Sequence, residues 1–261
     1  MKSQIIKLIK YVIKTRRTYW FTAISKTKAR YARTTLGSLW LGVSTLLTVI
    51  CLGSVYGRVF NVINFREYFI YLGFGLVIWN PICEAINAAP LIFSKNSNSL
   101  KNSRIQPIFF VCQEWAFQIQ SFIQAFVMVY IVFFLFSPGI ILNLGASLIH
   151  FANLFLFIFW LQLLISLLGT KFTDLFQLLP VLTNLFFLLS PILYKKESLS
   201  SFSFIADFNP IYQVLRLLRS SIIDGKLNLE LGFIVFFSNL IFVVISFMVY
   251  VKMEKKLIFY L

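Results

Sequence analysis

Six long apolar runs, separated by short polar or charged segments, dominate the hydropathy pattern of this chain of 261 residues. They lie at about 36–60, 68–93, 107–136, 140–169, 175–194 and 230–251. A helix of about 25 residues rises roughly 37 Å, which is enough to cross a hydrocarbon core about 30 Å thick. The pattern therefore predicts an all-α membrane protein with six transmembrane helices.

A basic segment with its own periodicity precedes the first run. Its apolar and basic residues fall on different faces of a helix, with Ile5, Ile9, Val12 and Ile13 on one face and Lys7, Lys10, Lys14 and Arg17 on another. This pattern is typical of an amphipathic helix that lies on an anionic membrane surface, and a solvated basic tail is the alternative. We divide the chain into a cytoplasmic leader over residues 1–34, a six-span domain over 35–252 and a cytoplasmic tail over 253–261.

The composition supports a membrane location. Hydrophobic residues make up 59% of the chain, more than the interior of a soluble protein can bury. The formal net charge of +15 does not indicate nucleic-acid binding, because the basic residues gather at the ends of the apolar runs. Of the 24 Lys and Arg residues, 17 fall on the side of the membrane that holds the N-terminus. The positive-inside rule then predicts an inner-membrane protein whose termini are both cytoplasmic.

Two connections are too long to be simple turns. Residues 94–106 form a polar cytoplasmic loop, and residues 195–229 form an outer loop with many apolar residues. Within the outer loop, residues 209–223 have helical spacing, with one side formed by Val214, Leu217, Leu218 and Ile222. Gly225 suits the left-handed position that ends a helix. We expect short helices here that dip into the outer leaflet or cover the spans.

The sequence contains no pattern that indicates catalysis. Its only Gly-Lys pair, Gly225-Lys226, is followed by Leu227, so the phosphate-binding loop of ATPases is missing from the sequence. His150 has no Cys or carboxylate neighbour at metal-ligand spacing, and the three Cys residues lie far apart in apolar runs. We expect no catalytic residue, no metal site and no cofactor in this chain.

Two carboxylates lie inside predicted spans. Glu84 and Glu114 stand at similar distances before and after the cytoplasmic loop, which places both roughly 12–15 Å deep. An unpaired charge at that depth costs about 2.5–3.5 kcal/mol. We therefore expect ion pairs with Arg30, Arg33 or Arg104, unless the carboxylates reach interfacial water.

Small and polar residues distinguish the first and fifth spans. Gly53 and Gly57 are spaced for close helix packing, either at a dimer contact or within the chain. The fifth span combines hydroxyl, amide and proline residues, namely Pro180, Thr183, Asn184, Ser190 and Pro191. These groups suit a passage for sugars, and ordinary packing around a proline kink is the alternative.

Five short motifs carry a resemblance to a known family. In chain order they are Arg30-Tyr31 followed by Leu36-Gly37-Ser38-Leu39-Trp40, then Tyr71-Leu72-Gly73-Phe74-Gly75-Leu76 followed by Trp79, then Phe172-Thr173-Asp174, Ser190-Pro191-Ile192-Leu193-Tyr194 and Phe208-Asn209-Pro210. The last two form the most specific pair. Together the motifs resemble the permease subunit of bacterial ABC polysaccharide exporters, which carry O-antigen, capsule or teichoic acid.

The resemblance implies a transporter of two permeases and two ATPase subunits, with ATP and Mg held by the ATPase and a tunnel lined by the first and fifth spans. It places the cytoplasmic entrance, near the diphosphate of the lipid carrier, at Arg30, Tyr31, Arg33, Leu36, Gly37 and Trp40. It places the tunnel lining at Thr183, Asn184, Phe187 and Tyr194, and the outer gate at Pro191, Phe208, Asn209, Pro210 and Tyr212. It places contacts with the ATPase at Asn96, Lys101, Asn102, Arg104, Gln106, Lys171 and Asp174.

These observations predict the transmembrane subunit of an ATP-driven exporter of undecaprenyl-diphosphate-linked or other lipid-linked polysaccharide, of O-antigen or capsule type. Its expected partners are a second copy of itself, two ATP-binding-cassette subunits, the lipid-linked polysaccharide and membrane lipids, and not nucleic acid. The alternatives are a related ABC exporter of drugs or small lipids and a membrane glycosyltransferase. A channel is disfavoured because the sequence shows no ring-forming charged filter.

Overall fold

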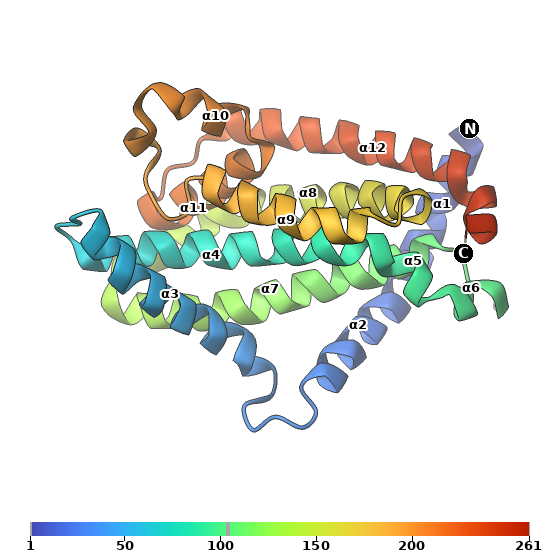
Figure 1. The fold of residues 1–261 in the computed structure, drawn as a ribbon, viewed down its shortest axis with the longest axis horizontal. Helices are drawn as coiled ribbons and strands as arrows, with labels where there is room; N and C mark the ends of the chain where they lie inside the picture. The colour runs from blue at the N-terminus through green and yellow to red at the C-terminus, as the bar shows by residue number, and fades with distance from the viewer. Residues whose placement is uncertain (1, 103–104, 261) are drawn as a thin grey trace.

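The computed structural model describes residues 2–102 and 105–260, and these residues contain five long apolar helices. Four of them run along the length of the molecule, and the first crosses the others obliquely (Figure 1). Within those residues, the helices long and apolar enough to cross a membrane are α3 (Trp40–Val59), α4 (Phe65–Ala88), α7 (Ile108–Phe136), α8 (Leu144–Lys171) and α12 (Leu229–Tyr260). The shorter α-helices are α1 (Lys2–Lys14), α2 (Arg16–Arg30), α5 (Ile92–Lys95), α6 (Ser97–Asn102), α9 (Leu175–Leu189), α10 (Ser203–Phe208) and α11 (Pro210–Asp224). Short 3-10 segments lie at Gly37–Leu39, Ala89–Leu91, Pro138–Asn143 and Lys196–Phe202. The all-α prediction is confirmed.

The fifth apolar run forms a shorter helix than its length predicts. Helix α9 has 15 residues, because the backbone becomes extended at Ser190 (φ −86°, ψ 133°). Pro191 follows directly, and a proline disfavours helical geometry at the residue before it. Fifteen residues rise only about 22 Å, less than the ~30 Å hydrocarbon thickness. The described residues therefore contain five helices long and apolar enough to span a membrane, where six spans were predicted. A sixth crossing by α9 and the turn after it stays a prediction.

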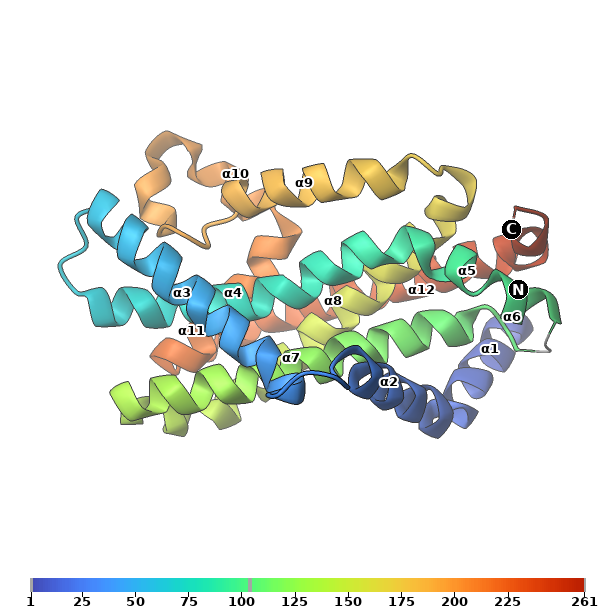
Figure 2. The same ribbon diagram turned by 60° about the horizontal axis from the view of Figure 1, so that its bottom comes forward.

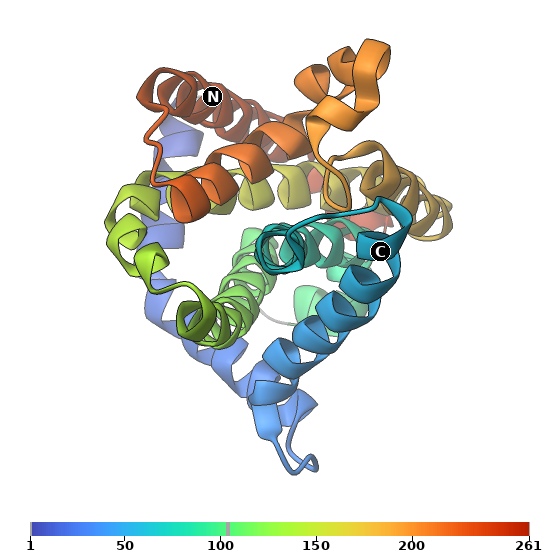
Figure 3. The same cartoon turned by 90° about the vertical axis from the view of Figure 1, so that its left-hand side faces the viewer.

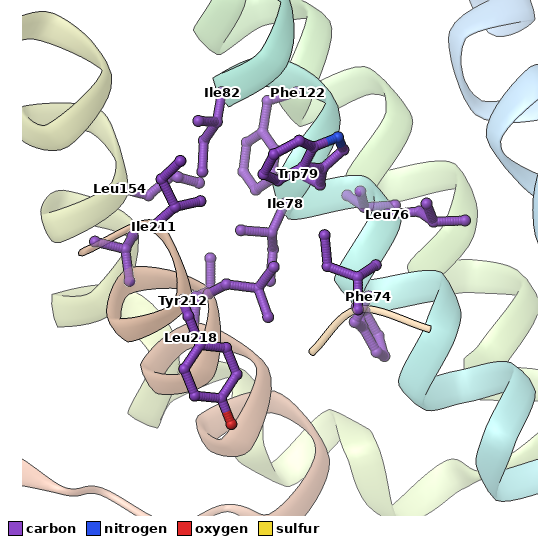
Figure 4. Close-up of a cluster of buried hydrophobic side chains, with 14 of the residues drawn as sticks. Phe74, Leu76, Ile78, Trp79, Ile82, Phe122, Leu154, Ile211, Tyr212 and Leu218 are labelled. Atoms are coloured by element: carbon purple, nitrogen blue, oxygen red, sulfur yellow. The ribbon is translucent and has the colours of Figure 1, made fainter. Parts of the chain in front are cut away.

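Helix α4 is the best-enclosed of the long helices. Of its most apolar stretch, 72% is buried, against 22% for α3 and for α12. Phe74 and Ile82 on α4 belong to one buried cluster with Phe122 of α7, Leu154 of α8 and Leu218 of α11 (Figure 4). Side-chain burial on all sides explains why its sequence is apolar around most of its circumference.

The leader packs against the bundle as two helices. Helix α2 lies along α7, and α1 contacts α7 and α12 (Figure 2). Tyr19 meets the edge of Phe109 at a centroid distance of 6.5 Å, and Gln120 donates a hydrogen bond to the Trp20 carbonyl oxygen at 3.1 Å. These contacts bury Tyr19 and Ala23 of α2, whereas Ile9 and Ile13 on the predicted apolar face of α1 are exposed. A position at the membrane surface stays a prediction.

The outer loop folds as predicted into short helices that cover the spans. Helix α11 packs on α8 and α4, and the four apolar side chains expected on one side are all buried: Val214, Leu217, Leu218 and Ile222. Gly225 has φ +65° and ends α11, which confirms its role as a C-cap.

Different helices and turns lie at the two ends of the molecule (Figure 1). One end holds the turn between α3 and α4 together with α10 and α11, and Figure 3 views the bundle from this end. The opposite end holds α5, α6, the turn between α8 and α9, and both ends of the chain. Termini at one end agree with the predicted orientation, in which the polar loop and both termini face the cytoplasm.

Candidate functional site

The turn between α2 and α3 protrudes from the bundle and carries the predicted entrance residues (Figure 1). Gly37 has φ +57°, and no atom lies within 4 Å of the position that a Cβ would take. Glycine is therefore favoured here by backbone conformation and not by lack of space. Arg33, Leu36 and Trp40 are exposed around it, and Tyr31 is half-buried. The turn presents cationic and apolar groups together.

Two cations of α2 hold the carboxylates that lie inside the spans. Lys26 forms an ion pair with Glu114 of α7, and Arg30 lies 3.9 Å from Glu84 of α4. Lys26 and Arg30 also lie over the ring of Phe117, at 4.5 Å and 5.5 Å from its centroid. The pairing of Glu84 with Arg30 agrees with the sequence prediction. The partner of Glu114 is Lys26, where one of three arginines was predicted.

Helix α9 presents its polar side chains in two directions. Thr183 is buried against α4, where its Oγ1 lies 3.4 Å from Asn87 Oδ1. Phe187 also faces α4 and meets Trp79 at a centroid distance of 5.7 Å. Asn184, one residue after Thr183, is exposed. Of these three predicted tunnel residues, only Asn184 lies on the free face of the helix.

The two most specific motifs of the sequence meet in space. Asn209 is the N-cap of α11: its Oδ1 accepts hydrogen bonds from the backbone N–H groups of Ile211 (3.0 Å) and Tyr212 (3.3 Å). Pro210 occupies the first helical position, where no N–H is needed. The remaining Asn209 Nδ2 donates to Ser190 Oγ at 2.8 Å. A single side chain thus starts α11 and fixes the residue that ends α9.

Residues 190–194, here named the outer turn, are held by two tyrosines of α4. Tyr68 donates its hydroxyl hydrogen to the Leu193 carbonyl oxygen at 2.7 Å. Tyr71 donates to the Tyr194 carbonyl oxygen at 2.9 Å. These bonds satisfy backbone groups that the outer turn leaves without helical partners.

Arg219 of α11 completes the hold on the outer turn. Its Nη1 donates to the Pro191 carbonyl oxygen at 3.0 Å, and its guanidinium lies 3.6 Å from the centroid of the Tyr71 ring. The side chain is buried and, within the described residues, forms no ion pair with a carboxylate. Burial lowers the pKa of the guanidinium, and the neighbouring Tyr71 opposes this shift. A buried cation is retained here by a carbonyl oxygen and an aromatic face.

The remaining outer-gate residues lie around this contact. Burial raises the pKa of the Tyr212 phenol above its ordinary value of 10, so this hydroxyl stays neutral. Phe208 precedes the N-cap and is 85% exposed. An aromatic side chain so exposed beside a fixed turn is available to a ligand or a second chain.

Comparison with known proteins decides the family. The sequence profile of the ABC-2 type transporters matches residues 18–223, which run from α2 to the last turn of α11. The chain belongs to the ABC-2 type transporter family. Two relatives from Klebsiella pneumoniae, both named O-antigen export system permease protein RfbA, are 26% identical over 246 residues and 24% identical over 242 residues. Each alignment covers 88% of this chain and 89% of the relative.

This membership confirms the resemblance to permease subunits of ABC polysaccharide exporters. The chain is a multi-pass membrane subunit of an ABC transporter. The matched region contains the entrance turn, α9, the outer turn and α11, so all four parts of the candidate site belong to the shared domain.

In this ABC-2 transporter subunit, the residues predicted to contact an ATPase gather at the end of the bundle that holds both termini (Figure 1). Lys101 and Asn102 are exposed on α6, and Lys171 and Asp174 are exposed at the turn between α8 and α9. Two members serve the fold as well: Asn96 donates to the Ile92 carbonyl oxygen at 2.7 Å, and the Gln106 backbone N–H donates to Tyr11 Oη at 3.3 Å. Arg104 lies outside the described residues.

The glycines of α3 are used for packing within this ABC-2 chain. A Cβ at Gly53 would come within 2.9 Å of Phe69, and one at Gly57 within 2.7 Å of Phe65, both on α4. Of the two roles that the sequence left open, the structure shows close packing inside the chain. A contribution to a dimer contact stays a prediction.

Three residues that position the site are absent from the predictions made from sequence: Lys26, Tyr68 and Arg219. Lys26 lay among ten basic residues of the leader, and nothing in the sequence singled it out. Tyr68 looked like one of many aromatic residues at a span end. Arg219 carried a usable signal, because it stands four residues after Leu215 and three before Ile222 on the apolar side of a helix. A cation on such a face must find a buried partner.

Proposed function

We propose that this chain is the transmembrane subunit of an ATP-driven exporter that moves lipid-linked polysaccharide, of O-antigen or capsule type, across the bacterial inner membrane. The observation that carries the proposal is its similarity to two O-antigen export system permeases over 88% of its length. The family match over residues 18–223 adds support, because it includes the entrance turn, the short helix α9 and the outer helices together.

Two copies of the chain would enclose the passage. Helices α3 and α9 both pack on α4, and each keeps a long exposed face. Leu47 and Ile50 on α3 and Val181 and Leu188 on α9 are among the exposed apolar side chains. A second copy of the chain would cover these faces, and Asn184 would then supply an amide to hydroxyl groups that pass.

The entrance turn suits the diphosphate of a lipid carrier. Arg30 and Glu84 are 49% and 41% exposed, and their 3.9 Å separation is longer than a direct hydrogen bond. Arg30 is therefore loosely held and can turn toward a diphosphate. A guanidinium also binds phosphate oxygens in a two-pronged geometry that an ammonium lacks.

The motor would be a separate subunit. The sequence lacks the glycine-rich loop that cradles nucleotide phosphates, so ATP and Mg would be held by two ATP-binding-cassette partners. Helices α5 and α6 and the turn between α8 and α9 would receive the force. The ion pairs of Lys26 and Arg30 join α2 to α7 and α4, which lets the leader and these spans move as one unit.

The proposal is tested by ATP hydrolysis of the complex in lipid nanodiscs. We expect an undecaprenyl-diphosphate-linked polysaccharide to raise the hydrolysis rate severalfold and small hydrophobic compounds to leave it unchanged. The opposite pattern would favour an exporter of drugs or small lipids. Sugar transfer by the purified chain without any ATPase would favour a glycosyltransferase.

A further inference from the structure

We propose that a cavity between α3, α4 and α7 binds one uncharged sugar residue of the transported glycan, as a site separate from the diphosphate-binding turn. The inference rests on the proposed function and assigns a second, sugar-specific site to it. The cavity begins one residue after the entrance residue Trp40, at Leu41. A glycan whose diphosphate is held at the turn would therefore have its first sugars at this depth.

The size of the cavity suits a single sugar residue. Its volume is about 190 Å³. That is room for roughly six waters at ~30 Å³ each, which is the scale of one sugar ring and too small for a chain of them. Leu41 and Phe122 supply apolar surface for the C–H faces of a ring, while polar groups come from all three helices.

Ser121 of α7 is the strongest indication of a ligand. Its side chain is 5% exposed and lines the cavity, and its hydroxyl has no hydrogen-bond partner in the part of the chain that the structure describes. Serines in spans usually donate to a carbonyl oxygen of their own helix, as Ser166 does to Leu163 at 2.8 Å. A buried hydroxyl without such a bond is costly unless something in the cavity satisfies it.

Polar groups from the other two helices face the same space. Thr45 of α3 donates to the Leu41 carbonyl oxygen at 2.9 Å and accepts from Asn80 Nδ2 of α4 at 3.4 Å. Pro81, inside α4, has no N–H to offer the carbonyl of Val77, and both residues line the cavity. The cavity is thus lined by residues with hydroxyl and amide groups, Ser121, Thr45 and Asn80, which is the chemistry that sugar hydroxyls require.

Glu84 gives the cavity its preference for an uncharged ligand. Its carboxylate lines the cavity and pairs with Arg30 at 3.9 Å. A carboxylate accepts hydrogen bonds from sugar hydroxyls but repels phosphate. The two charged groups would therefore bind different parts of one substrate. The cation Arg30 would bind the diphosphate, and the carboxylate Glu84 would bind the sugar.

The test compares two ligands on the complex of permease and ATPase in nanodiscs: undecaprenyl diphosphate alone and the same carrier bearing its glycan. We expect the unaltered complex to bind the glycan-bearing carrier more tightly. Ser121→Ala and Asn80→Ala should each weaken binding of the glycan-bearing carrier by about fivefold to tenfold, the scale of one lost hydrogen bond, and leave binding of the bare carrier unchanged. Ser166→Ala, which removes a buried hydroxyl already satisfied in its own helix, is the matched control and should change neither.

Three results would overturn the inference. Equal losses for both ligands in Ser121→Ala and Asn80→Ala would show that the cavity only supports the fold. Normal preference for the glycan-bearing carrier in both variants would place sugar recognition elsewhere and leave the proposed function standing. Failure of the unaltered complex to bind either ligand would refute the sugar site and the proposed function together.

Discussion

Replacement of both Arg30 and Arg33 by Ala is expected to stop export while the protein still assembles with its partners. Both side chains are exposed at the protruding turn, so neither supports the core. Arg30 contacts other helices through its ion pair with Glu84 at 3.9 Å and through the Phe117 ring, whose centroid lies 5.5 Å from the guanidinium. Because the Arg30 side chain is 49% exposed, we expect assembly to survive the loss of both contacts. The loss of two guanidinium groups from a diphosphate site removes several charge-assisted hydrogen bonds, each worth about 1.5–3 kcal/mol. We expect surface polysaccharide to fall by more than tenfold.

Two companion variants separate charge from geometry. Lys28→Ala removes an exposed cation from the same stretch of α2 and should leave export near the unaltered level. Arg30→Lys keeps the charge without the planar fork and should give an intermediate loss. Undiminished polysaccharide at the cell surface in the double variant, measured beside an equal amount of co-purified ATPase, would refute the role of the entrance turn.

Replacement of Arg219 by Ala is expected to destabilise the protein by about 3 kcal/mol and to abolish export. The variant loses a charged hydrogen bond worth about 1.5–3 kcal/mol and a desolvated cation–π contact worth about 2 kcal/mol. The variant no longer has a charge to bury, and the saved desolvation free energy offsets part of this loss. Thermal unfolding of the detergent-purified protein measures the change in stability.

Arg219→Met separates stability from function. Methionine fills much of the same volume without a buried charge, so the stability should largely recover. It cannot donate to the Pro191 carbonyl oxygen, so the outer turn should stay loose and export should stay low. Arg216→Ala, exposed on the same helix, is the control and should change neither property. Full export in Arg219→Met would contradict the view that this contact positions the gate.

The outer half of the molecule was the easier half to predict from sequence. Asn209-Pro210 and Gly225 are local signals, because an N-cap, a first-position proline and a left-handed glycine act on their own helix. The spacing of the apolar residues between them was equally local, so the bounds and the buried side of α11 both followed. The structure adds that Asn209 also holds Ser190, a contact across 19 residues that no local rule contains.

The inner contacts were harder to predict, because they depend on how helices cross. The estimated membrane depth of Glu84 and Glu114 correctly predicted that both lie near the basic leader. Whether Lys26 or a nearby arginine pairs with Glu114 depends on how α2 lies along α7. The same is true of α9. Its apolar run is long enough to suggest a span, but the Ser190-Pro191 step ends the helix early. The hydropathy pattern shows which residues are apolar, but it does not show at which residue the backbone stops being helical.

The most direct test of the account is a cryo-EM structure of the chain assembled with its ATPase partner in a lipid membrane. The account predicts two copies of the chain, with α3 and α9 of each facing the other across a continuous central passage, and ATPase subunits docked against α5 and α6. Copies whose α3 and α9 face only lipid, with no passage between them, would contradict it.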